Sequence, residues 1–436
     1  MAKTFRDWNL DQGMLLPPSV RDFVPAGHLA HFLRDLVSQE LDLSAILGVY
    51  TEEKGYPPYH PTMMTALLLY GYCQGLYSSR RIAKACIERL DFMAVTALNQ
   101  PDFRTVSDFR KRHLKALEGL FVQVLKLAQK AGLARLGHVA LDGTKIKANA
   151  SKHKAMSYGR MRTTEATLTA EVRGWLATAE REDAAEDHRF HEATGEELPD
   201  WVAHKQQRLE QIRAARQALE AEARAQAAQG SAKAHSDDDP PPPPTRADGT
   251  LKDTAQRNFT DPDSRILKTA DGFVQGYNAQ IAVDADHQII VAQHLNACGA
   301  DVRQLPGMLR RIKANTGRQA QELSADAGYC SEENLKALKR HHIQGYVATG
   351  RVHHGSAAPE RRSQSPEVQA MHRKLRQGGW KSRYRLRKQV VEPVFGQIKH
   401  ARGFRQFLLR GLEKVQGEWS LICTAHNLLK LKSAMG

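Results

Sequence analysis

Cysteine is scarce in this sequence, and long apolar runs are missing from it. The 436 residues include five scattered cysteines, and no two of them form a CxxC pair. This pattern argues against a disulfide framework or a structural zinc site, and it fits a reducing cytoplasm. The longest apolar stretch, residues 62–73, is too short to span a bilayer, and the charged start of the chain (MAKTFRDWNLDQG) lacks the apolar centre of a signal peptide.

Several nucleotide and metalloprotease motifs are missing as well. The sequence has no GxGxxG, no P-loop and no HExxH. We therefore expect neither a dinucleotide nor ATP to bind, and no cofactor-binding residues are assigned.

Acidic residues are outnumbered by basic ones. Lys and Arg number 63 against 48 Asp and Glu, which gives a formal net charge of +15. The excess is concentrated in residues 351–410, where 15 Lys and Arg stand against 3 Glu and aromatic residues are interleaved. Such a segment is typical of a surface that binds the phosphate backbone of nucleic acid, and a solvated charged surface is the alternative.

The hydrophobic pattern divides the chain into a helical region and a region in which strands and helices alternate. Residues 1–135 have helical periodicity, which favours an all-α N-terminal DNA-binding domain; a plain helical domain with solvated charges fits the spacing equally well. Short apolar runs then alternate with helical segments, which predicts a mixed α/β sheet in a catalytic domain split into residues 136–160 and 263–412. Asp301 is expected to cap one of the helices of this domain.

Between the two halves of the α/β region lies a segment of different composition. Residues 161–230 are rich in Ala, Glu, Gln and Arg, with 14 acidic against 9 basic residues, and prolines follow at 240–244. Residues 161–262 are therefore predicted to form an inserted helical hairpin with a Pro-rich linker. Residues 413–436 are expected to form a C-terminal helix.

Two aspartates follow buried strands, and a glutamate lies in the basic segment. Asp142 and Asp326 each come after an apolar run and before a small residue, and Glu392 follows in the sequence. Carboxylates at the ends of strands in one sheet can converge, and such oxygen ligands suit Mg²⁺ or Mn²⁺ in phosphodiester chemistry. By position alone, turn residues that end strands are the more common interpretation of these aspartates.

Four motifs in this order resemble those of the DDE transposases of bacterial insertion sequences. They are LDGTKIKANAS at 141–151, QGYNAQ at 275–280, ADAGY at 325–329 and VEPVFGQIK at 391–399. The resemblance extends over nearly the whole chain. Its helical start (YHP at 59–61, RTVSDF at 104–109) is similar to the domain that precedes the catalytic core in one large subgroup.

The resemblance implies a fold, a reaction and a set of site residues. The fold would be ribonuclease-H-like, and Asp142, Asp326 and Glu392 would be the catalytic triad that holds Mg²⁺ or Mn²⁺. The enzyme would bind double-stranded DNA at the terminal inverted repeats, hydrolyse the element ends and join their 3′-hydroxyls to target DNA. Two ends imply a homodimer on DNA, in the bacterial cytoplasm at the nucleoid and without a membrane.

The family pattern Tyr-x2-Arg-x3-Glu-x6-Lys is matched with one irregularity. Tyr384 and Arg387 keep the first spacing and Glu392 and Lys399 the last, but four residues separate Arg387 from Glu392, so Lys388 occupies the family's Arg position. If the helix begins at Pro393, Arg387 can still serve the site; if it continues back through the proline, Lys388 lies one turn before Glu392. Further DNA contacts are expected from the basic side chains nearby, Arg383 and Arg385.

Two other functions remain open from the sequence. One is a catalytically silent DNA-binding regulator of the same descent, and the other is a stand-alone metal-dependent nuclease. The three acids favour an enzyme, since a binding protein has no need of them beside a basic surface.

Overall fold

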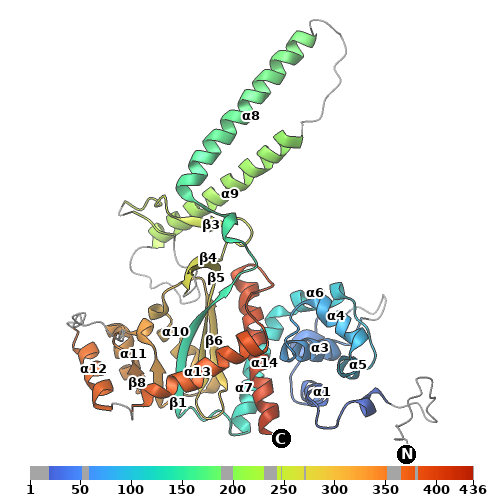
Figure 1. Ribbon diagram of the computed structural model, residues 1–436, viewed down its shortest axis with the longest axis vertical. Helices are drawn as coiled ribbons and strands as arrows, with labels where there is room; N and C mark the ends of the chain where they lie inside the picture. The colour runs from blue at the N-terminus through green and yellow to red at the C-terminus, as the bar shows by residue number, and fades with distance from the viewer. Residues whose placement is uncertain are drawn as a thin grey trace, which may run out of the picture. The chain divides into compact units, whose positions relative to one another are not determined.

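The computed structural model (Figure 1) describes residues 19–51, 58–187, 200–229, 243–246, 248–269, 272–350, 365–378 and 382–435. The prolines at 240–242 and residues 351–364 of the basic segment lie outside these ranges. The chain divides into two compact units, residues 1–134 with 420–436 and residues 135–419. In the part of the chain that is described, no helix is both long and apolar enough to cross a bilayer.

The first unit is helical, as the periodicity of the N-terminal region predicts. At its centre lies α3, which has Pro61 in its first turn and is buried along most of its length because almost every residue from Met64 to Cys73 is apolar. The last helix of the chain contributes its residues from Ser420 onward to this unit. The helices are α1 (Leu29–Gln39), α2 (Ser44–Leu47), α3 (Pro61–Cys73), α4 (Ser79–Glu88), α5 (Leu90–Thr96), α6 (Phe103–Arg112), α7 (Leu114–Lys130) and α14 (Leu412–Ala434).

The second unit is built on a mixed sheet. Strand β5 (Gly272–Asp284) pairs antiparallel with β1 (His138–Lys147) along one edge, and with β4 (Arg265–Thr269) and β6 (Ile290–Asn296) along the other. On the far side of β1, β7 (Glu322–Ala325) and β8 (Gln344–Val347) continue the sheet in parallel. The order β6-β5-β1-β7-β8, with β5 opposed to its neighbours, is the predicted ribonuclease-H-like sheet.

Helices pack against this sheet and follow its strands. Helix α13 (Leu386–Gly396) contacts β1, β5 and β7, and α10 (Leu305–Thr316) contacts β6. The inner strands β5 and β6 are largely buried, and they combine apolar residues with buried polar ones such as Gln275, Asn278 and Gln280 of β5. The remaining elements are α11 (Glu332–Arg340), α12 (Pro366–Gly378), the 3₁₀ turns η3 (Asp301–Arg303), η4 (Ala327–Tyr329) and η6 (Arg383–Arg385), and the π-helical turn η7 (Gln397–Ala401).

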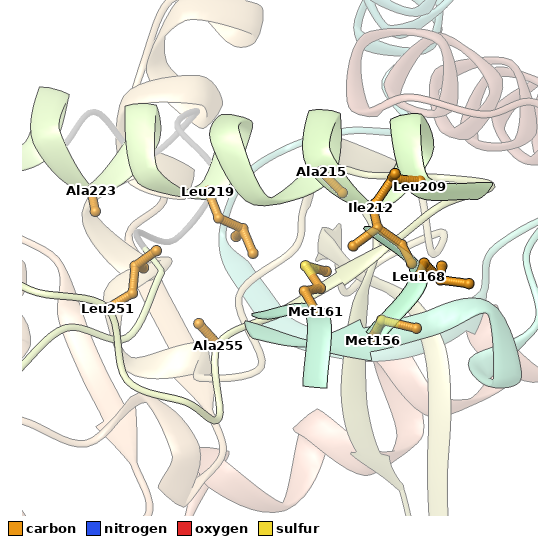
Figure 2. Packing of buried hydrophobic residues seen from close by; sticks show 10 residues of the cluster. All are labelled: Met156, Met161, Leu168, Leu209, Ile212, Ala215, Leu219, Ala223, Leu251 and Ala255. Atoms are coloured by element: carbon orange, nitrogen blue, oxygen red, sulfur yellow. The ribbon is translucent and has the colours of Figure 1, made fainter. Parts of the chain in front are cut away.

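The inserted segment forms a helical hairpin, α8 (Tyr158–Asp187) and α9 (Asp200–Gln229), which run side by side in Figure 1. Both helices are joined to the sheet domain through a small ladder in which β2 (Ala155–Ser157) pairs with β3 (Gln256–Asn258). The hairpin has an apolar core of its own, in which side chains of α8 and α9 meet residues flanking the ladder (Figure 2). Ion pairs add to it, since Glu165 accepts hydrogen bonds from Arg213 and Arg216.

Candidate active site

Asp142 and Asp326 lie at equivalent positions on neighbouring parallel strands. Leu141 of β1 is opposite Ala325 of β7, and these are the residues before the two aspartates. Asp326 follows the last residue of β7 as predicted, but Asp142 does not end its strand, because β1 continues to Lys147 along β5. Asp142 accepts from the N–H of the next residue in β1, Gly143, at 2.8 Å, and Asp326 caps the turn η4 by accepting from the Gly328 N–H at 2.8 Å. The sheet register therefore brings together two acids that are far apart in the sequence.

Helix α13 places a buried arginine against the first of these acids. Its sheet-facing side consists of Arg387, Val390, Val391 and Val394, at helical spacing. Arg387 donates from Nη1 to Asp142 Oδ2 at 2.6 Å, and its Nη2 lies 3.9 Å from Glu392 Oε1. The Glu392 side chain is 54% exposed, so it lies at the edge of the site with the guanidinium between it and Asp142.

The electrostatics of the site follow from this burial. Burial raises the pKa of Asp142 to about 6; Arg387 opposes the rise, and Asp326 and Asp301 add to it. For Arg387, burial acts to lower the pKa, but the nearby Asp142, Tyr384 and Asp326 outweigh it and hold the pKa above its usual value. The acids thus form a negative region that already contains one cation.

Of the two alternatives for Pro393, the structure has the second: the helix does not begin at the proline but continues through it. Helix α13 runs from Leu386 to Gly396 with Pro393 inside it. Proline has no N–H, so the carbonyl of Gln389, four residues earlier, loses its helical donor; the Gln288 side chain donates to that carbonyl at 3.2 Å. Because the Gln389 carbonyl has a hydrogen-bond donor from outside the helix, the helix can continue through Pro393.

The continuing helix was expected to favour Lys388 as the base beside the acids, and this expectation is wrong. Lys388 is exposed, on the outer side of α13 with Glu392, whereas Arg387 faces the sheet. Arg387 therefore meets Asp142 directly and approaches Glu392 with its other nitrogen. Arg387 and Glu392 lie on different sides of α13, and the long, planar guanidinium of Arg387 reaches across this difference.

The other residues of the basic motif divide into two groups. Lys399, in the π-helical turn η7, donates to Thr144 Oγ1 and to the Lys145 carbonyl at 3.2 Å, two and three residues beyond Asp142. Burial, with Lys145 adding to it, lowers the pKa of the Lys399 ammonium. Arg383 instead lies 3.4 Å from Glu322, at the beginning of β7, and Arg385 is exposed in the same 3₁₀ turn.

The sequence interpretation missed a polar group beside Asp142. Asp301 does not cap a helix as expected: Ala300 precedes the 3₁₀ turn η3, and the Asp301 carboxylate points to strands β1 and β5. Its Oδ1 accepts from Lys145 Nζ (3.3 Å), Asn278 Nδ2 (2.7 Å) and Gln280 Nε2 (2.8 Å). The available signal was the set of amide side chains in the QGYNAQ motif, to which Asn278 and Gln280 belong.

The side chains present suit a hard divalent cation. Carboxylate oxygens from adjacent strands are the ligands that Mg²⁺ and Mn²⁺ prefer, and the Arg387 guanidinium shows that these acids attract a positive charge. Within the described ranges, no three Asp, Glu, His or Cys side chains converge closely enough to enclose an ion. Asp142 and Asp326 thus supply ligand oxygens of the right kind, but the Arg387 guanidinium has to move aside before Asp142 and Glu392 can both reach an ion.

Two family models match the chain. A model described as transposase domain (DUF772) matches residues 18–112, and one described as transposase DDE domain matches residues 248–428. The second match includes Asp326, Glu392 and Lys399, while Asp142 and the helical hairpin lie between the two matched segments. The comparison with curated proteins and the comparison with solved structures returned no match.

Proposed function

Because this chain belongs to the DDE transposases of insertion sequences, of the type with an N-terminal transposase domain, we propose that Asp142, Asp326 and Glu392 are its catalytic acids. The observation that carries the proposal is the parallel pairing of β1 and β7, which sets Asp142 beside Asp326. The approach of Glu392 to the same guanidinium that binds Asp142 supports the third assignment.

Transposase DDE domains use divalent metal ions, and here Asp142 and Asp326, with Glu392, would hold Mg²⁺ or Mn²⁺. Such ions activate an attacking oxygen and stabilise the leaving oxygen of a phosphodiester. The chain itself supplies the charge balance. Arg387 neutralises Asp142 in the free protein, and its displacement toward a DNA phosphate would free the carboxylate.

Lys399 is positioned to contact the DNA backbone next to the acids. It is anchored on Thr144 and Lys145, on the strand that carries Asp142. Lys388 and Arg385, exposed on α13 and the preceding turn, extend the basic surface away from the acids. We expect these side chains to bind phosphates of the element end, with Tyr384 beside Arg387.

The reaction inferred from these groups is hydrolysis at the terminal inverted repeats followed by attack of the 3′-hydroxyls on target DNA. Two element ends require two copies of the site, so the active form would be a homodimer on DNA. The helical N-terminal unit would recognise the repeats, because the matched transposase domain covers most of its described part.

The test uses the full-length protein and labelled duplexes that carry the ends of the element, with Mg²⁺ or with EDTA. We expect metal-dependent cleavage that Asp142→Asn and Asp326→Asn abolish while the binding of end DNA in EDTA persists. Asp286→Asn, in the exposed β5–β6 turn, is the matched control and should cleave normally. Wild-type cleavage by either active-site variant would refute the assignment.

The same assay separates the alternative functions. A silent regulator would bind the ends without cutting them in any metal. A stand-alone nuclease would cut but never join a 3′-end to a second duplex. Terminal inverted repeats and short target duplications in the flanking genomic DNA would support the transposase.

A further inference from the structure

The side chain of Asp301 connects three of the four motifs that carry the family resemblance. It accepts from Lys145 in the first motif and from Asn278 and Gln280 in the second. Gln280 in turn accepts a hydrogen bond from the hydroxyl of Tyr329, in the third. Asn278, Gln280 and Tyr329 are fully buried, so these bonds have no competing solvent.

This network lies directly against the backbone that follows each catalytic aspartate. A Cβ atom on Gly143 would stand 2.1 Å from Gln280 Nε2 and 2.9 Å from Asp301 Oδ1, so only glycine fits after Asp142. In the turn η4, which follows the neighbouring strand, a Cβ on Gly328 would lie 3.5 Å from Asp301 Oδ2 and 3.0 Å from Asp326 Oδ1. Asp301 therefore lies between the Asp142–Gly143 step and the turn that holds Asp326.

The bonds to Asp301 are suited to holding this arrangement. Lys145 contributes a charged donor, and the two amides contribute donors fixed on a central strand. Gln280 is itself fixed by Asn278, whose Oδ1 accepts from Gln280 Nε2 at 3.1 Å. The three donors lie on β1 and β5, and the turn that carries Asp326 is linked to them by the hydrogen bond from the Tyr329 hydroxyl to Gln280. The network therefore connects the strand that carries Asp142 to the turn that carries Asp326.

We propose that Asp301 is a positioning residue for the catalytic acids: through Asn278, Gln280 and Lys145 it fixes the relative placement of Asp142 and Asp326, and thereby the geometry in which they bind a divalent ion. The inference rests on the proposed function of those two acids. Asp301 acts through its hydrogen bonds, and its own oxygens stay on these donors.

The test measures the binding of Mn²⁺ to the full-length protein by calorimetry, alongside cleavage of end DNA. Groups that orient metal ligands change metal affinity by about 10–100-fold when removed, so Asp301→Ala should weaken Mn²⁺ binding by that factor and lower the cleavage rate. Asp301→Asn keeps an acceptor oxygen toward Asn278 and Gln280 and should stay within about threefold of the wild type. Asp286→Ala serves as the control for the loss of an acid elsewhere on the unit.

The outcomes separate this inference from the function on which it rests. If the wild type neither binds Mn²⁺ nor cleaves, the proposed function fails. If the wild type does both and Asp142→Asn does neither, while Asp301→Ala matches the wild type, the positioning role is refuted. Should Asp301→Ala not fold, as judged by circular dichroism, Asp301→Asn decides alone: an affinity within about threefold of the wild type supports positioning through hydrogen bonds, and a loss of about tenfold or more refutes it.

Discussion

Replacing Arg387 with alanine removes the counter-ion of a buried carboxylate. The side chains of Arg387 and Asp142 are 10% and 17% exposed, and their atoms approach to 2.6 Å. Breaking a buried pair on one side costs about 3–5 kcal/mol, because the remaining charge stays without compensation. Asp142 can escape part of this cost by taking up a proton, since its pKa is already raised to about 6. We therefore expect the lower end of the range at pH 7, about 3 kcal/mol.

The assay is thermal and urea unfolding of the Arg387→Ala variant beside Lys388→Ala. Lys388 is the exposed neighbour on the same helix, so its replacement should change the stability by less than about 0.5 kcal/mol. A loss of about 3 kcal/mol corresponds to a melting temperature lower by about 6–12 °C for a domain of this size.

The pH dependence of the loss has a definite sign. A carboxyl group whose pKa is raised by folding contributes stability below its unfolded pKa of about 3.9 and loses that contribution as the pH rises through the folded value. Removing Arg387 raises the folded pKa of Asp142 further. The gap between the variant and the wild type should therefore widen from pH 5 to pH 8.

A double-mutant cycle with Asp142→Asn completes the test. The two changes should be strongly non-additive, since each removes the partner of the other. Equal stability of Arg387→Ala and Lys388→Ala, or additive losses in the double variant, would refute the buried ion pair as the link between α13 and β1.

Three further predictions follow from the site and the hairpin. At limiting Mg²⁺, cleavage should weaken below about pH 6, where a proton competes for Asp142, and a half-saturating Mg²⁺ concentration that does not change between pH 5 and 7 would contradict this. Lys388→Ala should reduce the log–log salt slope of DNA binding by about 0.9. Arg383→Ala should reduce the slope by less, because Glu322 already neutralises the Arg383 side chain. Filter binding over salt concentrations of roughly 50 to 300 mM measures both slopes. Leu219→Ala should destabilise the hairpin by about 2–4 kcal/mol and speed its proteolysis without changing the sheet, whereas Gln211→Ala, on the exposed side of α9, should do neither.

The sequence predicts those features that depend on local pattern. Apolar runs of strand length predict the mixed sheet that the structure contains, whereas its ribonuclease-H-like arrangement was expected from the family resemblance. The composition of residues 161–230 gives the long helices α8 and α9. The mixed sheet and the long helices each follow from the periodicity and composition of contiguous residues.

The features that were missed depend on contacts between distant segments. Pro393 stays inside a helix because Gln288, about a hundred positions earlier, donates to the freed carbonyl of Gln389. Asp301 has the sequence context of a helix cap, but its partners lie on strands β1 and β5. At both positions, the outcome depends on hydrogen-bond donors from distant segments that only the tertiary fold brings close. The catalytic roles of Asp142, Asp326 and Glu392 stay a prediction for the cleavage assay.

The ladder between β2 and β3 defines where the helical hairpin could be replaced by design. Ser157 is opposite Gln256, so the chain leaves the sheet domain and returns to it at paired residues. A replacement segment would have to join only these two ends, and the pairing of β1 with β5 and β7 would not depend on it. It would also have to cover Met156, which is buried in the apolar core of the hairpin.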